Sequence, residues 1–244
     1  MDKTKEFRVF HGDRAIVLNS GGIDSTTCLA YTLEYFDKSH VSTVSFLYGQ
    51  KHSKELECAK EIADYYGVKH YVLNISEILR YSDCSLMQNS TQEVELSSYA
   101  EQVTRDKSGM VSTYVPFRNG LMLSAVASLA FSLNPDAKTD IVIGAHADDA
   151  AGNAYADCSL DFIRSMDKAI STGTYGKINI VAPFVNNNKG QVVACGLKLK
   201  VPYNKTWSCY LGGDKACGKC GTCIDRLEAF KINGATDPIE YEVN

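Results

Sequence analysis

The chain has 244 residues, of which 45% are hydrophobic, and a formal net charge of −4. This length and composition fit one large domain with a small appendage and exclude wholesale disorder. No apolar run approaches the roughly 18 residues of a membrane span, and no signal-peptide pattern follows the start, so we expect a cytoplasmic protein. Because the charge is negative and no basic run occurs, direct nucleic-acid binding is not expected.

Short apolar runs alternate with amphipathic patterns along residues 14–200, which predicts βαβ units with right-handed crossovers. The expected strands are residues 15–18, 41–47, 70–74, 141–144 and 178–182. The expected helices are residues 26–36, 53–66, 119–133, 160–170 and 189–199. The sequence therefore predicts an α/β fold with a doubly wound, mainly parallel five-stranded sheet over residues 1–200, and a small module over residues 201–244.

Two segments depart from this alternation. Residues 76–113 are polar and weakly periodic, so we expect an excursion over the strand ends that is a solvated loop for most of its length. The helix expected over 119–133 is unusually apolar and should be buried, either against the sheet or against a second copy in a homodimer. A large core explains that helix equally well.

The segment Asn19-Ser20-Gly21-Gly22-Ile23-Asp24-Ser25 joins the first strand to the first helix. Adjacent glycines let a ligand approach the main chain closely. The free amides and the dipole of the helix N-terminus favour a phosphate at this place. Asp24 would repel phosphate directly, so it suits a helix cap or a ligand to a magnesium ion held by the nucleotide.

The loop is neither a P-loop, because Gly-Lys-Ser/Thr is missing, nor the dinucleotide fingerprint, because Gly-x-Gly-x-x-Gly is absent. It resembles the Ser-Gly-Gly-x-Asp-Ser loop of the ATP pyrophosphatases, in which ATP phosphates are held while an oxygen of the substrate attacks the α-phosphate. A turn that only caps a helix is the alternative. The residues expected to bind ATP are Leu18, Asn19, Ser20, Gly21, Gly22, Ile23, Asp24, Ser25, Thr26 and Thr27.

Four of the nine cysteines, Cys209, Cys217, Cys220 and Cys223, lie within fifteen residues. Four thiolates form the closed tetrahedral shell of a structural zinc ion, so we expect one Zn²⁺ per chain and no catalytic role for it. An iron–sulfur cluster is the main alternative, since Cys-x2-Cys-x2-Cys also occurs there. Disulfides conflict with the expected compartment.

Together these motifs resemble one family, the 7-cyano-7-deazaguanine synthases, over about residues 14–230. The similar segments are residues 18–28, the run Tyr48-Gly49-Gln50-Lys51-His52 followed by Glu55-Leu56-Glu57, the run Val115-Pro116-Phe117-Arg118-Asn119, and Thr206-Trp207-Ser208-Cys209-Tyr210 leading into the four cysteines. The loop alone fits many ATP enzymes, whereas the loop with this cysteine module fits few. The resemblance implies an adenine nucleotide alpha hydrolase-like fold with the ATP-pyrophosphatase (PP-loop) loop.

The resemblance also implies a carbon–nitrogen ligase of queuosine biosynthesis that converts 7-carboxy-7-deazaguanine, ammonia and ATP into 7-cyano-7-deazaguanine. A carboxylate is a poor electrophile, and transfer of an adenylyl group gives it a good leaving group. Ammonia then forms an amide, and a second activation of the amide oxygen permits loss of water to the nitrile. An anion-binding loop and Mg²⁺ would offset the phosphate charge.

Candidate catalytic residues are Asp24, Lys51, His52 and Arg118. Candidate substrate-binding residues are Asn119, Asp149, Tyr155, Asp157 and Lys189. Several of these side chains have a plain structural interpretation. Lys51 could be a solvated lysine, Asn119 a helix cap and His146 a satisfied structural histidine. Cys158 is expected to be a buried thiol, and Trp207 to pack the cysteine module onto the main domain.

The chain departs from the family pattern at a few positions. The family usually has a small residue at Phe117 and frequently an acid at Gln191. Where it commonly has Gly-Tyr-Pro-Asp-Cys-Arg, this chain has Asn153-Ala154-Tyr155-Ala156-Asp157-Cys158-Ser159. The missing arginine leaves the substrate contacts open.

Other functions fit the same motifs. A related enzyme could stop at the amide or use another amine, and a transfer RNA-modifying ATPase of the superfamily would need a basic surface that the charge disfavours. A nucleotide sensor would bind ATP without turnover. The sequence leaves open whether the nucleotide product is AMP or ADP.

Overall fold

The protein was analysed as a computed structural model that describes residues 9–105, 111–150 and 154–242. Five parallel strands form one sheet in the order β3-β2-β1-β4-β5. The strands are β1 (Arg14–Leu18), β2 (Val41–Leu47), β3 (Lys69–Asn74), β4 (Thr139–Val142) and β5 (Ile178–Val181). This confirms the α/β fold and the five-stranded parallel sheet.

The α-helices are α1 (Ile23–Thr32), α2 (Lys54–Tyr66), α3 (Ser76–Leu79), α4 (Tyr99–Arg105), α5 (Arg118–Leu133), α6 (Ala147–Ala150), α7 (Leu160–Gly173), α8 (Lys189–Lys198) and α9 (Gly221–Ile232). Short 3₁₀ turns occur at Lys38–His40, Ala156–Cys158 and Tyr203–Lys205. None of the helices in the described residues is long and apolar enough to cross a membrane.

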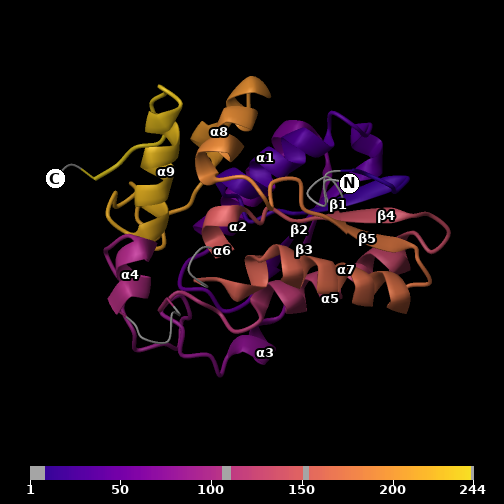
Figure 1. Ribbon diagram of the computed structural model, residues 1–244, viewed down its shortest axis with the longest axis horizontal. Coiled ribbons are helices and arrows are strands. Elements are labelled where there is room, and N and C mark those ends of the chain that lie inside the picture. Colours follow the sequence, from indigo (N-terminus) through magenta and orange to yellow (C-terminus); the bar gives the residue numbers. More distant parts are fainter. Residues whose placement is uncertain (1–8, 106–110, 151–153, 243–244) are drawn as a thin grey trace.

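The sheet is covered on both faces, as a doubly wound fold requires (Figure 1). Ile16 of β1 points to the face covered by α5 and α7, and it shares a core with Leu123 and Ile163. Its neighbour Val17 points to the opposite face, which is covered by α1, α2, α8 and α9. Alternation along each strand therefore supplies two cores, which explains why the strands read as continuous apolar runs.

For most of its described length the segment at residues 76–113 is the loop that its polarity predicted, but it departs from that prediction in two respects. It contains α3 and α4, and Leu86 and Met87 are buried in the core shared with α5. Gln50 and Met87 form an isolated antiparallel bridge, which fixes the segment over the carboxyl end of β2. A few buried apolar side chains thus anchor a stretch whose average composition is polar.

Helix α9 was not expected, and the first helix ends at Thr32 instead of Phe36. The cysteine module is not packed separately, because Ala229 and Phe230 of α9 lie in the same core as β1 and α1.

The division of the chain at residue 200 stays a prediction. The part of the 153–159 motif at residue 153 lies outside the described residues.

A buried ion pair ties α9 to the segments on either side of it. The Arg226 guanidinium donates to both carboxylate oxygens of Asp237, at 2.6 and 2.9 Å, and also to the hydroxyl of Thr206 at 2.8 Å. Both charged side chains are almost fully buried. The bidentate geometry and the extra acceptors compensate for the cost of removing these charges from water.

We expect Asp237→Asn to lower the free energy of unfolding by about 3 kcal/mol, because it leaves the Arg226 charge buried without a carboxylate. Chemical denaturation of the two proteins measures this difference. Asp136→Asn, at an exposed turn, is the matched control and should leave stability unchanged. An equal midpoint for D237N and the unmodified chain would show that the pair contributes nothing.

Candidate active site

The carboxyl ends of β1, β2 and β4 meet at one cavity, where the strand order reverses direction around β1. Open α/β sheets bind ligands at this position. The cavity is lined by the loop after β1, the start of α2 and the start of α5, and α4, α8 and residues 207–210 complete its walls. Polar and apolar side chains from distant parts of the chain therefore converge here.

The loop after β1 is held by its own side chains. The Gly21 amide donates to Asn19 Oδ1 at 3.0 Å, and the Ser20 amide donates to Ser25 Oγ at 3.2 Å. The exposed Gly22 amide has only a long contact, 3.4 Å, to Ser20 Oγ. Gly22 is the N-cap of α1 and offers no side-chain acceptor to the first-turn amides. An anion can therefore approach Gly22 and the first turn of α1, whereas the earlier amides shape the loop.

Gly21 is pressed against α2. Its φ angle is +78°, a left-handed conformation that suits glycine. An added Cβ would lie 2.4 Å from the carbonyl oxygen of Glu55 and 2.8 Å from the amide nitrogen of Ala59. Both of these are main-chain atoms of the helix, so they cannot swing aside.

We therefore expect Gly21→Ala to cost about 2 kcal/mol of stability and to weaken ATP binding, because the loop must move away from α2. Gly173→Ala is the matched control, since a Cβ there meets no atom within 4 Å. Thermal unfolding and nucleotide titration of both variants measure the effect. If G21A bound ATP as the parent does, the loop would not be fixed by this contact.

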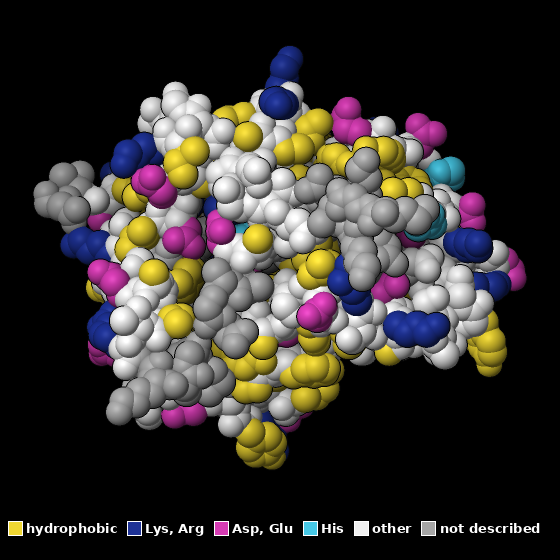
Figure 2. Space-filling view, in the orientation of Figure 1, with side chains coloured by type: hydrophobic (Ala, Val, Ile, Leu, Met, Phe, Trp, Pro, Cys, Tyr) yellow, Lys and Arg dark blue, Asp and Glu magenta, His cyan; other side chains and the backbone are white. Residues whose placement is uncertain are grey.

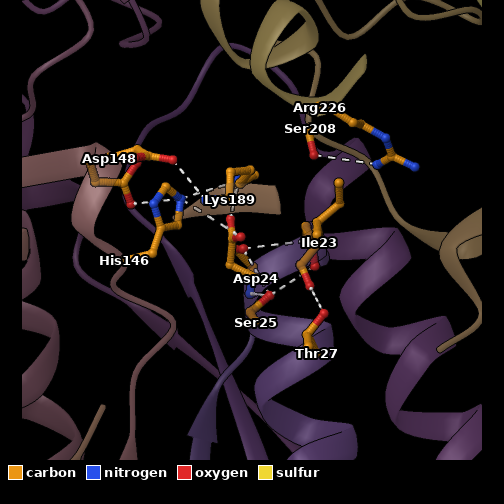
Figure 3. A network of polar contacts seen from close by, with 12 residues as sticks. Ile23, Asp24, Ser25, Thr27, His146, Asp148, Lys189, Ser208 and Arg226 are labelled. Atoms are coloured by element: carbon orange, nitrogen blue, oxygen red, sulfur yellow. Dashed lines mark hydrogen bonds and ion pairs between the residues drawn. The ribbon is translucent and has the colours of Figure 1, made fainter. Parts of the chain in front are cut away.

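At the start of α1, Asp24 lies in a charged network (Figure 3). Its carboxylate pairs with the ammonium of Lys189, the first residue of α8, and lies 3.8 Å from His146 Nε2. Burial raises the pKa of Asp24, but the charges of Lys189 and His146 outweigh this, so that its pKa is lowered overall. Asp149, 3.3 Å from the same His146 nitrogen, has a pKa raised by burial.

Arg118, the first residue of α5, also lines the cavity. Its guanidinium donates a long hydrogen bond, 3.5 Å, to the hydroxyl of Tyr48 and lies 5.4 Å from the centre of that ring. No carboxylate of the described chain lies within ion-pairing distance of it. A half-buried cation without an acidic partner is the group expected where a ligand supplies the anion.

Three tyrosines form an aromatic wall beside Arg118. Tyr99 of α4 and Tyr155 pack edge to face with ring centres 5.6 Å apart, and Tyr99 shares a hydrogen bond with Tyr210 at 2.7 Å. The Tyr155 hydroxyl is 2.5 Å from Thr113 Oγ1. The wall is therefore fixed by its own hydrogen bonds, and it offers rings of the kind on which a flat heterocycle packs.

Of the predicted catalytic residues, Asp24 and Arg118 line the cavity, whereas Lys51 and His52 do not. Lys51 is exposed and its ammonium donates to the carbonyl of Gln92 at 2.8 Å. His52 packs against Gly212 of the cysteine module, and burial lowers its pKa. The structure gives neither side chain access to the cavity.

Among the predicted substrate contacts, Asn119, Asp149, Tyr155 and Lys189 line the cavity and Asp157 does not. The carboxylate of Asp157 accepts the main-chain amide of Asn119 at 2.9 Å, so it caps the first turn of α5. The Asn119 side chain donates to the carbonyl of Asp157 and to the sulfur of Cys158. These bonds hold the start of α5, and hence Arg118, in place.

Several lining residues were not singled out from the sequence. They are Tyr48, Gln50, Glu55, Tyr99, Thr113, Ser208, Tyr210 and Asp225. Burial raises the pKa of Glu55 to about 7, against the opposing charge of Arg118. Glu55 belongs to the second family motif, so the sequence signalled its position although it was given no role. The contribution of Tyr99 had no sequence signal, because it depends on how residues 76–113 fold back.

The four cysteines form one buried cluster, with their sulfur atoms all within 4.8 Å of one another. Sulfurs bound to one metal ion at about 2.3 Å stand about 3.8 Å apart, and those of Cys217 and Cys223 are 3.9 Å apart. The amides of Lys219 and Cys220 point at the sulfur of Cys217 from 3.4 Å. The geometry thus fits a single metal ion with four thiolate ligands.

The segment at residues 206–210 joins this cluster to the loop after β1. The Trp207 amide donates to the carbonyl of Gly21 at 2.9 Å, and its indole nitrogen donates to the carbonyl of Cys209. The ammonium of Lys54 lies 3.5 Å from the indole ring centre. Trp207 is buried, so it packs the module onto the main domain as predicted.

Comparison with known proteins decides the family. The model of the family described as "Queuosine biosynthesis protein QueC" matches residues 14–234. The chain belongs to the QueC family. It is 42% identical to the 7-cyano-7-deazaguanine synthase of Caldicellulosiruptor saccharolyticus over 94% of this chain and 96% of that protein. It is 40% identical to the synthase of Thermoplasma acidophilum over 94% and 92%.

Among solved structures, the QueC-family chain is similar to the U34-tRNA thiolase NcsA from Methanococcus maripaludis, at 13% identity and a TM-score of 0.49, covering 95% of this chain and 71% of that one. The NMN synthetase from Francisella tularensis gives 15% identity and a TM-score of 0.46, with 92% and 79% covered. These likenesses are too remote to bear on function.

The departures from the QueC pattern have local structural roles. Gln191 completes a capping box with Asn188 at the start of α8, and Ser159 Oγ accepts the amide of Phe162 at the start of α7. Phe117 takes a left-handed conformation and packs over Gly120. None of the three substituted positions lines the cavity.

Proposed function

We propose that this QueC-family chain is an ATP-dependent ligase that converts 7-carboxy-7-deazaguanine and ammonium into 7-cyano-7-deazaguanine. One observation carries the proposal: a single cavity is lined both by the glycine loop and by Arg118, whose guanidinium has no carboxylate partner in the described chain. The loop suits the phosphates of ATP, and the guanidinium suits the carboxylate that ATP must activate. The names and near full-length match of the curated relatives support the same reaction.

In this proposal the loop and the first turn of α1 hold the phosphates of ATP. Lys189, which is paired with Asp24, lies next to them and offsets negative charge there. Arg118 holds the substrate carboxylate, and the tyrosine wall of Tyr99, Tyr155 and Tyr210 packs against the flat base. The site thereby brings the carboxylate oxygen to the α-phosphorus in a fixed orientation, which is the main contribution that positioning makes to such a transfer.

The side chains near the loop also fit a magnesium ion. Asp24 Oδ1 is buried without a hydrogen-bond partner in the described chain, and Asp149 and Asp225 line the same part of the cavity. Carboxylate oxygens are the ligands that Mg²⁺ prefers. When bound, the ion would neutralise charge on the phosphates.

At the cysteine cluster we propose one structural Zn²⁺. Sulfur spacing for a single ion, four buried protein ligands and a start of α9 at Gly221 support this assignment. The N-terminal end of that helix lies next to Cys220 and Cys223, where its dipole stabilises negative sulfur. A closed shell leaves no position for substrate.

ATP as substrate and the absence of any disulfide among the described cysteines support a cytoplasmic setting.

A homodimer also stays a proposal. The most apolar helix, α5, buries Leu123, Val126 and Ala130 in the core of the same chain, so it does not require a second copy.

The test is turnover of the purified protein with 7-carboxy-7-deazaguanine, ammonium and Mg-ATP. We expect the nitrile by mass spectrometry, together with acid-dependent exchange of pyrophosphate into ATP. An amide as the final product, or a product from another amine, would restrict the reaction to its first half. ADP in place of AMP would replace adenylyl transfer by phosphoryl transfer. Absence of any acid-dependent ATP consumption would overturn the ligase.

A further inference from the structure

The proposed reaction makes an unusual demand on proton transfer. Nitrogen enters as ammonium with four N–H bonds and leaves in a nitrile with none. A proton acceptor must therefore stand near the nitrogen atom and act more than once in each turnover. The acceptor must also be separate from the groups that hold phosphate, because those have to keep their charge.

Glu55 is the carboxylate whose position meets this demand. It is the second residue of α2, lines the cavity, and its main-chain carbonyl is the atom against which Gly21 is pressed. Its own backbone thus touches the loop that is proposed to hold ATP. Its charge interacts with that of Arg118, which lines the same cavity. Glu55 therefore adjoins the proposed phosphate loop, and its carboxylate is within electrostatic range of the proposed carboxylate anchor.

The side chain of Glu55 is also uncommitted. No hydrogen bond or ion pair joins its carboxylate to another group in the part of the chain that the structure describes. Of the other acids that line the cavity, Asp24 pairs with Lys189 and Asp149 contacts His146 at 3.3 Å, and Asp225 belongs with them to the proposed magnesium site. A half-buried acid without a partner is available to a substrate atom.

We propose that Glu55 is the general base that removes protons from the reacting nitrogen in both halves of the reaction. This inference rests on the proposed function and adds a catalytic residue to it. Asp24 and Asp149 are assigned to the magnesium ion that neutralises the phosphates, whereas Glu55 is assigned to proton transfer from the amine nitrogen.

In the first half, the Glu55 carboxylate takes a proton from ammonium and releases it to water, and the ammonia so formed attacks the carbonyl carbon of the acyl adenylate and forms a C–N bond. The Glu55 carboxylate takes one proton from the nitrogen, the C–O bond to AMP breaks with its electron pair on the phosphate oxygen, and the amide remains. In the second half, the oxygen of the amide attacks a second ATP and pyrophosphate leaves. Removal of the nitrogen's two remaining protons then yields the nitrile as AMP departs with the oxygen.

The surroundings of Glu55 suit repeated proton transfer. The charged and titratable groups that face it are Arg118 of α5, Tyr48 after β2, Cys209 of the cysteine cluster and Cys58 of its own helix. Burial raises the pKa of Glu55 to about 7, so it can accept a proton and release it to water near neutral pH. A carboxylate at its ordinary pKa would be a much weaker base.

The test compares Glu55→Gln and Glu55→Asp with Glu57→Gln, an exposed acid on the same helix whose side chain binds Ser53. We expect E55Q to lower nitrile formation at least about 100-fold, as loss of a general base does. Acid-dependent pyrophosphate exchange should persist in E55Q, because activation precedes the proton transfer. E55D should recover much of the lost rate, and E57Q should behave as the unmodified chain.

A second readout separates a base from a structural role. Hydroxylamine is uncharged at pH 7.5, so E55Q should still form the hydroxamate from the acyl adenylate, and its rate with ammonium should recover as pH rises. Full nitrile formation by E55Q would overturn this inference alone. Loss of exchange together with product in a folded E55Q would also overturn it, since Glu55 would then bind substrate. An unmodified chain without exchange would instead overturn the proposed function.

Discussion

Arg118→Lys should lower kcat/KM for the carboxylate substrate about 100- to 1000-fold, or ~3–4 kcal/mol. Arg118 lines the cavity without an acidic partner in the described chain, and its planar guanidinium can bind a carboxylate with two hydrogen bonds. Lysine keeps the positive charge but cannot donate two parallel hydrogen bonds to one carboxylate. The substrate carboxylate would therefore be held at the wrong angle to the α-phosphate of ATP. The Michaelis constant for ATP should change little. Steady-state kinetics with each substrate varied in turn gives both values.

The two halves of the reaction provide an internal control for Arg118. The amide intermediate carries no carboxylate, so R118K should convert 7-amido-7-deazaguanine to the nitrile with a much smaller loss. Arg80→Lys, at the C-cap of α3 where Arg80 pairs with exposed Glu77, should match the unmodified chain in both assays. Equal losses with the acid and the amide would assign Arg118 to the nucleotide or to the base.

The strands and the glycine loop could be predicted from the sequence because their determinants are local. A parallel strand covered on both faces is a continuous apolar run, and β2 has the bounds that its pattern predicted. The loop after β1 combines a strand end, two glycines and a helix start within a few residues. Such signals do not depend on distant parts of the chain.

The orientation of side chains next to a motif could not be predicted in the same way. Gln50 and Lys51 are neighbours in one motif, but the bridge from Gln50 to Met87 extends the backbone there. Successive side chains then point to opposite sides, so Gln50 is buried and lines the cavity while Lys51 reaches solvent. That bridge depends on residues 76–113, whose fold carried no clear periodic signal.

Helix α9 was missed for a related reason. Its first turn contains Gly221 and Cys223, which read as a metal-binding turn, and its buried residues include the charged Arg226. Burial of an arginine is acceptable only because Asp237 lies beyond the helix in the folded chain. The apolar residues of the sequence alone therefore underestimate how many residues of this helix are buried in the core.

Cys220→Ser should have the largest effect on stability. A structural zinc ion contributes on the order of 10 kcal/mol to folding of its module, and this variant would leave three thiolates facing one another without a complete shell. The effect should reach the ATP site, because Trp207 beside the cluster holds the carbonyl of Gly21. We expect loss of bound metal, a thermal midpoint lowered well beyond that of D237N, and no nitrile formation.

Metal analysis of the unmodified chain should give one zinc per chain and no iron, since the sulfur atoms lie within 4.8 Å of one another. Cys195→Ser, a half-buried thiol on α8 outside the cluster, is the matched control and should keep metal, stability and activity. If C220S retained its metal and its midpoint, the cluster would not be a closed four-thiolate site. If C220S lost the metal but still bound ATP as the parent does, the hydrogen bond from Trp207 to Gly21 would not couple metal binding at the cysteines to ATP binding in the cavity. The two outcomes separate the metal site from its link to the cavity, because only the second depends on how residues 206–210 meet the loop.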